Sequence, residues 1–340
     1  MSARPGAPAR FVGIDMLKGC AILWVMLIHA EALRGHAVFT HLVNHAVGIF
    51  VVLFGLNSEL WWRGRELRSD LVRWYASRAR RLLVPMWAAL AVWWALVLSF
   101  RPEGVHLSAR LAVAQAGGYA THIRTGWFIT AILQLVLLFP LLLALGRRFG
   151  RGPVFAAGLA CTLGAVAVTP WIFWHWGQFN ANVFSPRLLA HVTFGMLLAP
   201  HVGRLGWRAG GAAALAVAGA ILVEERLAPD LLPYTQRLIE PPLVVVLLLV
   251  MERLRRVPGM AAALGWLGVN SYGLYLGQLL IHNAFLFALG LGGLHERLNP
   301  WAYAGALLVG ALVFCRLGAA LPRALQALRR VGTPVPDLAR

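Results

Sequence analysis

The sequence predicts an all-α protein, a polytopic bundle of about ten transmembrane helices with both termini in the cytoplasm. Hydrophobic residues make up 59% of its 340 positions and charged residues only 13%, so a water-soluble chain of this length would lack the polar residues to cover its surface. Apolar stretches of about 16 to 25 residues recur, close to the length needed to cross a hydrocarbon core of about 30 Å. We place them at 14–33, 43–62, 82–100, 126–145, 153–174, 186–203, 209–225, 238–253, 265–289 and 299–321.

The net charge of +18 follows the predicted topology. With the N-terminus in the cytoplasm, 22 of the 31 Lys and Arg residues fall on the cytoplasmic face and 8 on the opposite face, while Arg316 lies within the last stretch. This asymmetry is the positive-inside bias of membrane proteins. The basic charge therefore orients the chain, and we expect no nucleic-acid partner.

One membrane domain accounts for the whole chain, residues 1–340, with short cytoplasmic tails at about 1–12 and 323–340. The N-terminal residues lead straight into a full-length apolar stretch, so we expect no removable signal peptide. Segment 66–81 carries apolar residues at helical spacing among arginines, which predicts an interfacial amphipathic helix before the third span. The three cysteines lie in separate spans, and we expect neither a disulfide framework nor a metal site.

The first span contains two ionisable residues, Lys18 and His29, with ten residues between them. This spacing is about three helical turns, so both side chains share a face and lie roughly 16 Å apart along the axis. Ionisable groups inside a span are costly and point to function. Two structural interpretations stay open: Lys18 extends to the interface, and His29 is a polar contact between helices. A histidine there could also take a proton from a hydroxyl or amine.

Two carboxylates are candidates to assist these residues. Glu31 lies two positions after His29 and could orient it only if the helix ends or bends there. Glu59 lies near the cytoplasmic end of the second span, where it could neutralise Lys18 or an arginine.

Arg78 and Arg81 stand one helical turn apart at the cytoplasmic end of the third span. Paired guanidinium groups suit a phosphate-bearing ligand because they bind its oxygens bidentately. The alternative is that they belong only to the positive-inside cluster.

These residues resemble the motifs of acyltransferase family 3, the bacterial membrane acyltransferases. Asp15, Lys18, Gly19 and His29 resemble its first-span signature, and further similarities follow in the family's order: Gly48–Gly55, Arg78 and Arg81, Gly126–Phe128, and Gly268–Leu276. Two positions depart from the pattern. Phe54 stands where a serine usually precedes the glycine, and Gln278 stands where the late span usually offers a histidine, which His282 could replace from one turn further on.

The resemblance implies transfer of an acyl group, commonly acetyl from acetyl-CoA, to a hydroxyl or amine of a carbohydrate, cell-envelope glycan or glycolipid, in the bacterial inner membrane. The bundle would then enclose a path from basic residues at the cytoplasmic face to a deep histidine. The expected catalytic residues are His29 and Glu31. Those expected to bind the cofactor are Lys18, Arg78, Arg81 and Glu59, and those expected to bind the acceptor are Trp127, Arg187, His191, Gln178 and His282.

Other functions fit parts of this pattern. A flippase or exporter of a glycan or lipid intermediate would use the same polar path without covalent chemistry, and a sensory or scaffold protein would not need the buried Lys18 and His29. The tryptophans near the acceptor candidates also fit an interfacial aromatic belt. Hydroxyl and amine acceptors stay open alternatives.

Overall fold

The computed structural model describes residues 11–30, 42–100, 108–118, 126–176, 183–226, 232–284 and 299–331. Within these ranges the regular elements are helices, and none is a strand. They are α1 (Val12–His29), α3 (Ala46–Trp62), α4 (Leu67–Phe100), α5 (Ala109–Ala116), α6 (Trp127–Phe149), α7 (Arg151–Trp176), η2 (Ser185–Leu188), α8 (Leu189–Leu198), η3 (Val202–Arg204), α9 (Trp207–Arg226), α10 (Leu232–Leu254), α11 (Met260–Val269), α12 (Ser271–Asn283) and α14 (Pro300–Val331).

Five of the described helices are long and apolar enough to cross a membrane. They are α1, α4, α6, residues Arg151–Trp171 of α7 and residues Pro300–Gly318 of α14. Shorter apolar helices cover Ala46–Trp62, Trp207–Leu222 and Met260–Val269. The prediction of a polytopic helical bundle is confirmed, whereas the number of ten crossings and the cytoplasmic position of both termini stay predictions.

Two of the predicted spans are not single long helices. The stretch at 265–289 is interrupted at Asn270, where α11 ends and α12 begins, and the Asn270 side chain donates to the Trp266 carbonyl at 2.8 Å. The stretch at 186–203 contains α8, whose 10 residues rise only about 15 Å and cannot cross a hydrocarbon core alone. Apolar length alone did not predict either interruption.

The basic segment at 66–81 is helical and leads into the third predicted span without a break. It forms the first turns of α4, a continuous helix of 34 residues that also contains the third predicted span. Trp74 on this segment is fully buried, with its ring 5.4 Å from that of Phe139 and 5.7 Å from that of Trp62. Trp74, on the apolar face of the segment, therefore packs on protein, and the interfacial position of the segment stays a prediction.

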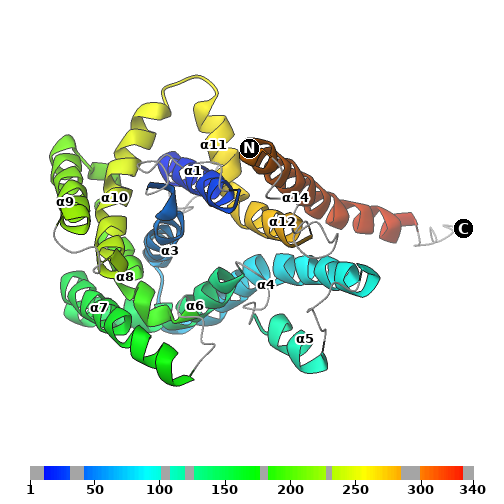
Figure 1. Ribbon diagram of the computed structural model, residues 1–340, viewed down its shortest axis with the longest axis horizontal. Coiled ribbons are helices and arrows are strands. Elements are labelled where there is room, and N and C mark those ends of the chain that lie inside the picture. The colour runs from blue at the N-terminus through cyan, green and yellow to red at the C-terminus, as the bar shows by residue number, and fades with distance from the viewer. Residues whose placement is uncertain are drawn as a thin grey trace, which may run out of the picture.

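Helix α1 packs against α3, α10, α11, α12 and α14. In Figure 1, α1 and α3 lie near the middle, with α7–α10 on the left and α4, α12 and α14 on the right. The contact with α11 is a backbone-to-backbone approach through Gly19 and Gly268. A β-carbon at Gly268 would lie 1.7 Å from the Asp15 carbonyl oxygen, and one at Gly19 would lie 2.1 Å from that of Leu264. Small residues permit such close helix packing in membranes.

Replacing Gly268 with alanine is expected to separate α1 from α11 and lower stability by about 1–3 kcal/mol, the usual cost of overpacking. The measurement is the thermal unfolding midpoint of the detergent-purified protein. Gly265→Ala is the matched control, because a β-carbon at Gly265 on the same helix meets nothing within 4 Å. Equal midpoints for the two variants would show that the close approach does not limit stability.

Candidate active site

His29 is the last residue of α1, and its imidazole is held by a side chain from α12. Nδ1–H of His29 donates to Oε1 of Gln278 at 3.0 Å. An amide oxygen can only accept, so Nδ1 carries a proton, and in the neutral ring Nε2 then keeps its lone pair. Gln278 is fully buried, and its Nε2 has no hydrogen-bond partner among the described residues. The residue that departs from the family pattern is thus the direct partner of His29.

Two further polar side chains complete this group. The rings of His29 and His282 lie 5.4 Å apart between centroids, and Nδ1 of His282 shares a hydrogen bond of 2.9 Å with the Tyr303 hydroxyl. We refer to His29, Gln278, His282 and Tyr303 as the His29 cluster. Gln278 and His282 are one turn apart on α12, so they share a face of that helix. Tyr303 comes from α14, so three helices supply the cluster.

An aromatic contact joins this part of α12 to the start of α6. Tyr275, one turn before Gln278, lies 5.7 Å from the ring of Phe128, and Phe128 lies 6.1 Å from Trp127. Trp127, which the sequence predicts to bind the acceptor, therefore connects to the α12 face of Gln278 and His282 through two aromatic rings. A role of Trp127 in binding stays a prediction.

Lys18, about three turns before His29 on α1, forms an ion pair with Asp15 at 3.2 Å. Its side chain is 23% exposed, so it lies at the edge of the packed core. This contact neutralises Lys18 within its own helix, and Asp15 is also the residue whose carbonyl meets Gly268 of α11.

Arg78 and Arg81 lie on the turn of α4 that approaches the α11–α12 junction. The Arg78 guanidinium stacks on the Trp74 ring at 4.2 Å from its centroid, while Arg81 is exposed. The Tyr272 hydroxyl at the start of α12 donates to the Leu82 carbonyl at 3.0 Å. The backbone of α4 just after Arg81 and the backbone of α1 at Asp15 thus both contact the segment from Gly268 to Tyr272.

Glu59 pairs with an arginine rather than with Lys18. Arg151 at the start of α7 donates to Glu59 Oε1 through Nε at 3.0 Å and through a terminal nitrogen at 2.5 Å. The sequence left both partners open. The cofactor-binding role predicted for Glu59 is untested, and its contacts tie α3 to α7.

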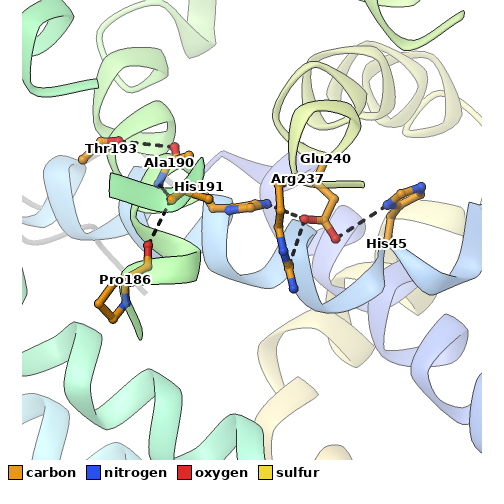
Figure 2. Close-up of polar contacts among 8 residues, drawn as sticks. His45, Pro186, Ala190, His191, Thr193, Arg237 and Glu240 are labelled. Carbon is orange, nitrogen blue, oxygen red and sulfur yellow. Dashed lines mark hydrogen bonds and ion pairs between the residues drawn. The ribbon is translucent and has the colours of Figure 1, made fainter. Parts of the chain in front are cut away.

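His191 belongs to a second polar group that lies inside the bundle. Its Nε2–H donates to the Glu240 carboxylate, which also lies 3.2 Å from an Arg237 nitrogen and 3.6 Å from Nδ1 of His45. Figure 2 shows the carboxylate between His191 and His45, with Arg237 beside it. We refer to His45, His191, Arg237 and Glu240 as the Glu240 cluster. His45, His191 and Glu240 are each at most 4% exposed.

The local backbone explains how these groups fit. A β-carbon at Gly48 would lie 2.2 Å from the Glu240 carboxyl carbon, so only glycine leaves room for the carboxylate against α3. At the start of α8, Thr162 accepts from the Ala190 amide at 2.9 Å and donates to the Pro186 carbonyl at 3.1 Å. These contacts hold the first turn of α8, from which His191 projects.

The remaining acceptor candidates are only partly placed. Arg187 interacts electrostatically with Arg237 and Glu240, at the edge of the Glu240 cluster. Gln178 and Glu31 lie outside the described residues. His191 is fully buried against Glu240, whereas His282 is part of the His29 cluster.

Sequence reasoning missed five residues of the two clusters as site candidates: Gln278, Tyr303, Arg237, His45 and Glu240. A signal existed for the last two, because both are ionisable residues inside predicted spans, as Lys18 and His29 are. Gln278 was visible only as a departure from the family pattern. Tyr303 carried no signal in the sequence. In the described ranges, no three His, Cys, Asp or Glu side chains are arranged to hold a metal ion.

Comparison with known proteins agrees with this arrangement. The chain matches the family model Acyl_transf_3, described as an acyltransferase domain, over residues 11–319. Neither a curated protein nor a solved structure matches the chain. The matched range includes both the Lys18 end of α1 and all four residues of the His29 cluster. Since the model covers nearly the whole chain, the protein belongs to acyltransferase family 3 and is a membrane acyltransferase.

Proposed function

We propose that this acyltransferase moves an acetyl group from acetyl-CoA to a hydroxyl or amine of a carbohydrate or cell-envelope glycan, with His29 as general base. The observation that carries the proposal is the hydrogen bond from His29 Nδ1–H to Gln278, which leaves the Nε2 lone pair for the acceptor's proton. A neutral imidazole with one fixed tautomer is what a general base requires. Support for the acetyl donor comes from the family resemblance and from the basic residues Lys18, Arg78 and Arg81.

The reaction balances with these groups alone. His29 Nε2 takes the proton of the acceptor as its oxygen or nitrogen bonds to the acetyl carbon, and the carbon–sulfur bond breaks. The protonated His29 then returns the proton to the departing thiolate, so the base is regenerated. Lys18, Arg78 and Arg81 are the residues that would hold the phosphates of CoA, because guanidinium and ammonium groups bind phosphate oxygens. The acceptor would approach from the His29 side, near His282 and Trp127.

Replacing His29 tests whether it acts as the general base. His29→Ala is expected to slow acetyl transfer by about 10²–10⁴-fold, the usual contribution of a general base. The measurement is incorporation of radiolabel from acetyl-CoA into the glycan and lipid fractions of membranes that contain the protein. His201→Ala is the control, because His201 is an exposed histidine between α8 and η3. Label incorporation by the His29→Ala variant at the control's rate would exclude this base, and absence of any label with the unmodified protein would favour the exporter alternative.

Substitutions of Gln278 test whether its hydrogen bond fixes the tautomer of His29. Gln278→Leu keeps the approximate size but removes the acceptor for Nδ1–H, so kcat is expected to fall about tenfold, equivalent to one net hydrogen bond. Gln278→His restores an acceptor and is expected to retain most of the activity. KM for acetyl-CoA should stay unchanged in both variants. If leucine and histidine at this position lower kcat equally, the hydrogen bond does not set the reactivity of His29.

Replacing Arg78 and Arg81 tests whether they bind the acyl donor. The double variant Arg78→Ala/Arg81→Ala is expected to weaken CoA binding at least about tenfold, because charge-assisted hydrogen bonds to phosphate are lost. Calorimetric titration of the purified protein with CoA measures this. Arg73→Ala/Arg80→Ala removes two exposed arginines from the same helix and should bind CoA normally. Thermal midpoints of both doubles identify any loss that arises from the Arg78–Trp74 stack rather than from the ligand.

A further inference from the structure

A groove of about 810 Å³ lies away from the His29 cluster and from the arginine turn of α4. Three segments form it: the start of α1, the connection from η3 into α9, and the last turns of α10 with the residues that follow. In Figure 1 the α9 and α10 helices lie side by side on the left of the bundle, in agreement with their extensive packing. The groove is lined by Phe11, Gly13, Ile14, Val202, Gly203, Leu205, Gly206, Trp207, Gly210, Val246, Leu248, Leu249, Val250, Glu252, Arg253, Arg255 and Arg256.

One part of the groove is strongly basic. Arg253, Arg255 and Arg256 line it, and all three are exposed. Glu252 is the one acidic residue in the described lining, and it pairs with Arg255 at 2.7 Å. With three arginines and one glutamate, the described lining therefore carries a net charge of +2. The positive-inside bias assigns this face to the cytoplasm, so these charges lie at the level of lipid headgroups.

The rest of the groove is apolar and has room for a chain. Val246 and Leu249 lie one turn apart on α10, so they continue the lining along the helix away from the arginines. On the opposite wall, Gly206 carries no side chain, and a β-carbon there would meet nothing within 4 Å. Trp207 stands beside it with 79% of its surface exposed, as tryptophans do at membrane interfaces.

We propose that this groove binds an anionic phospholipid, with its phosphate against Arg253 and Arg256 and part of an acyl chain along Val246 and Leu249. The combination of excess positive charge and an adjoining apolar wall matches a ligand that is anionic at one end and apolar at the other. Basic grooves between membrane helices recognise anionic headgroups in this way. The groove shares no residue with Lys18, Arg78 and Arg81, the residues proposed above to bind the acyl donor.

Mass spectrometry of the intact, detergent-purified protein tests the proposal, with dioleoyl phosphatidylglycerol or dioleoyl phosphatidylcholine added. The unmodified chain is expected to retain phosphatidylglycerol in preference to phosphatidylcholine. Arg253→Ala/Arg256→Ala is expected to bind phosphatidylglycerol about 30-fold more weakly, since each arginine near an anionic headgroup contributes about fivefold to the affinity. Arg68→Ala/Arg73→Ala removes the same charge from exposed positions on α4 and should leave retention unchanged.

Gly206→Trp provides a second variant that keeps the arginines and fills the groove. This variant is expected to lose phosphatidylglycerol as well. Such a loss would show that binding depends on the shape of the groove and not on its charge alone. The proposal is overturned if the unmodified chain holds both lipids equally, if the two arginine doubles lose lipid equally, or if Gly206→Trp retains it. Displacement of phosphatidylglycerol by an equal amount of CoA would also overturn it, because the groove would then be a nucleotide site.

Discussion

The contact between Gly19 of α1 and Gly268 of α11 determines how the candidate active site is assembled. Their backbones are so close that a β-carbon on either glycine would overlap a carbonyl oxygen of the other helix. Because α12 follows α11 directly after Asn270, fixing α11 on α1 also directs the next helix along α1. Gln278 and His282 consequently reach His29, and the Tyr272 hydroxyl reaches α4 near its arginines. One close helix contact therefore positions residues at both ends of α1.

The sequence predicted the helical membrane class, the spacing of Lys18 and His29 and the arginine pair, because these depend on local periodicity and apolar length. It could not predict the break at Asn270, since one long helix and two short helices can have the same apolar pattern. Nor could it predict partners: Lys18 pairs with Asp15, Glu59 with Arg151 and His29 with Gln278. The last two of these pairs join different helices, and helix packing alone brings their residues together.

The buried carboxylates Glu240 and Glu59 are each paired with basic side chains. Glu240 would be very unfavourable alone in an apolar interior, and it is surrounded by an arginine and two histidines from α3, α8 and α10. Glu59 is similarly buried and held by Arg151. Such pairs cost desolvation, so their presence is weak evidence of added stability. The His29 cluster differs because its described contacts are between uncharged groups, and a proton can be added to it without breaking an ion pair.

The position of His29 at the end of α1 has an electrostatic consequence. The carbonyl groups of the last helical turn give that end a partial negative charge, which favours a cation by about 0.3–1 kcal/mol and more where water is excluded. His29 is the basic residue of that turn. When its ring accepts a proton, the new positive charge forms at the negative pole of the macrodipole of α1. The peptide groups of α1, aligned along its axis, thus stabilise the imidazolium at the C-terminal end of the helix.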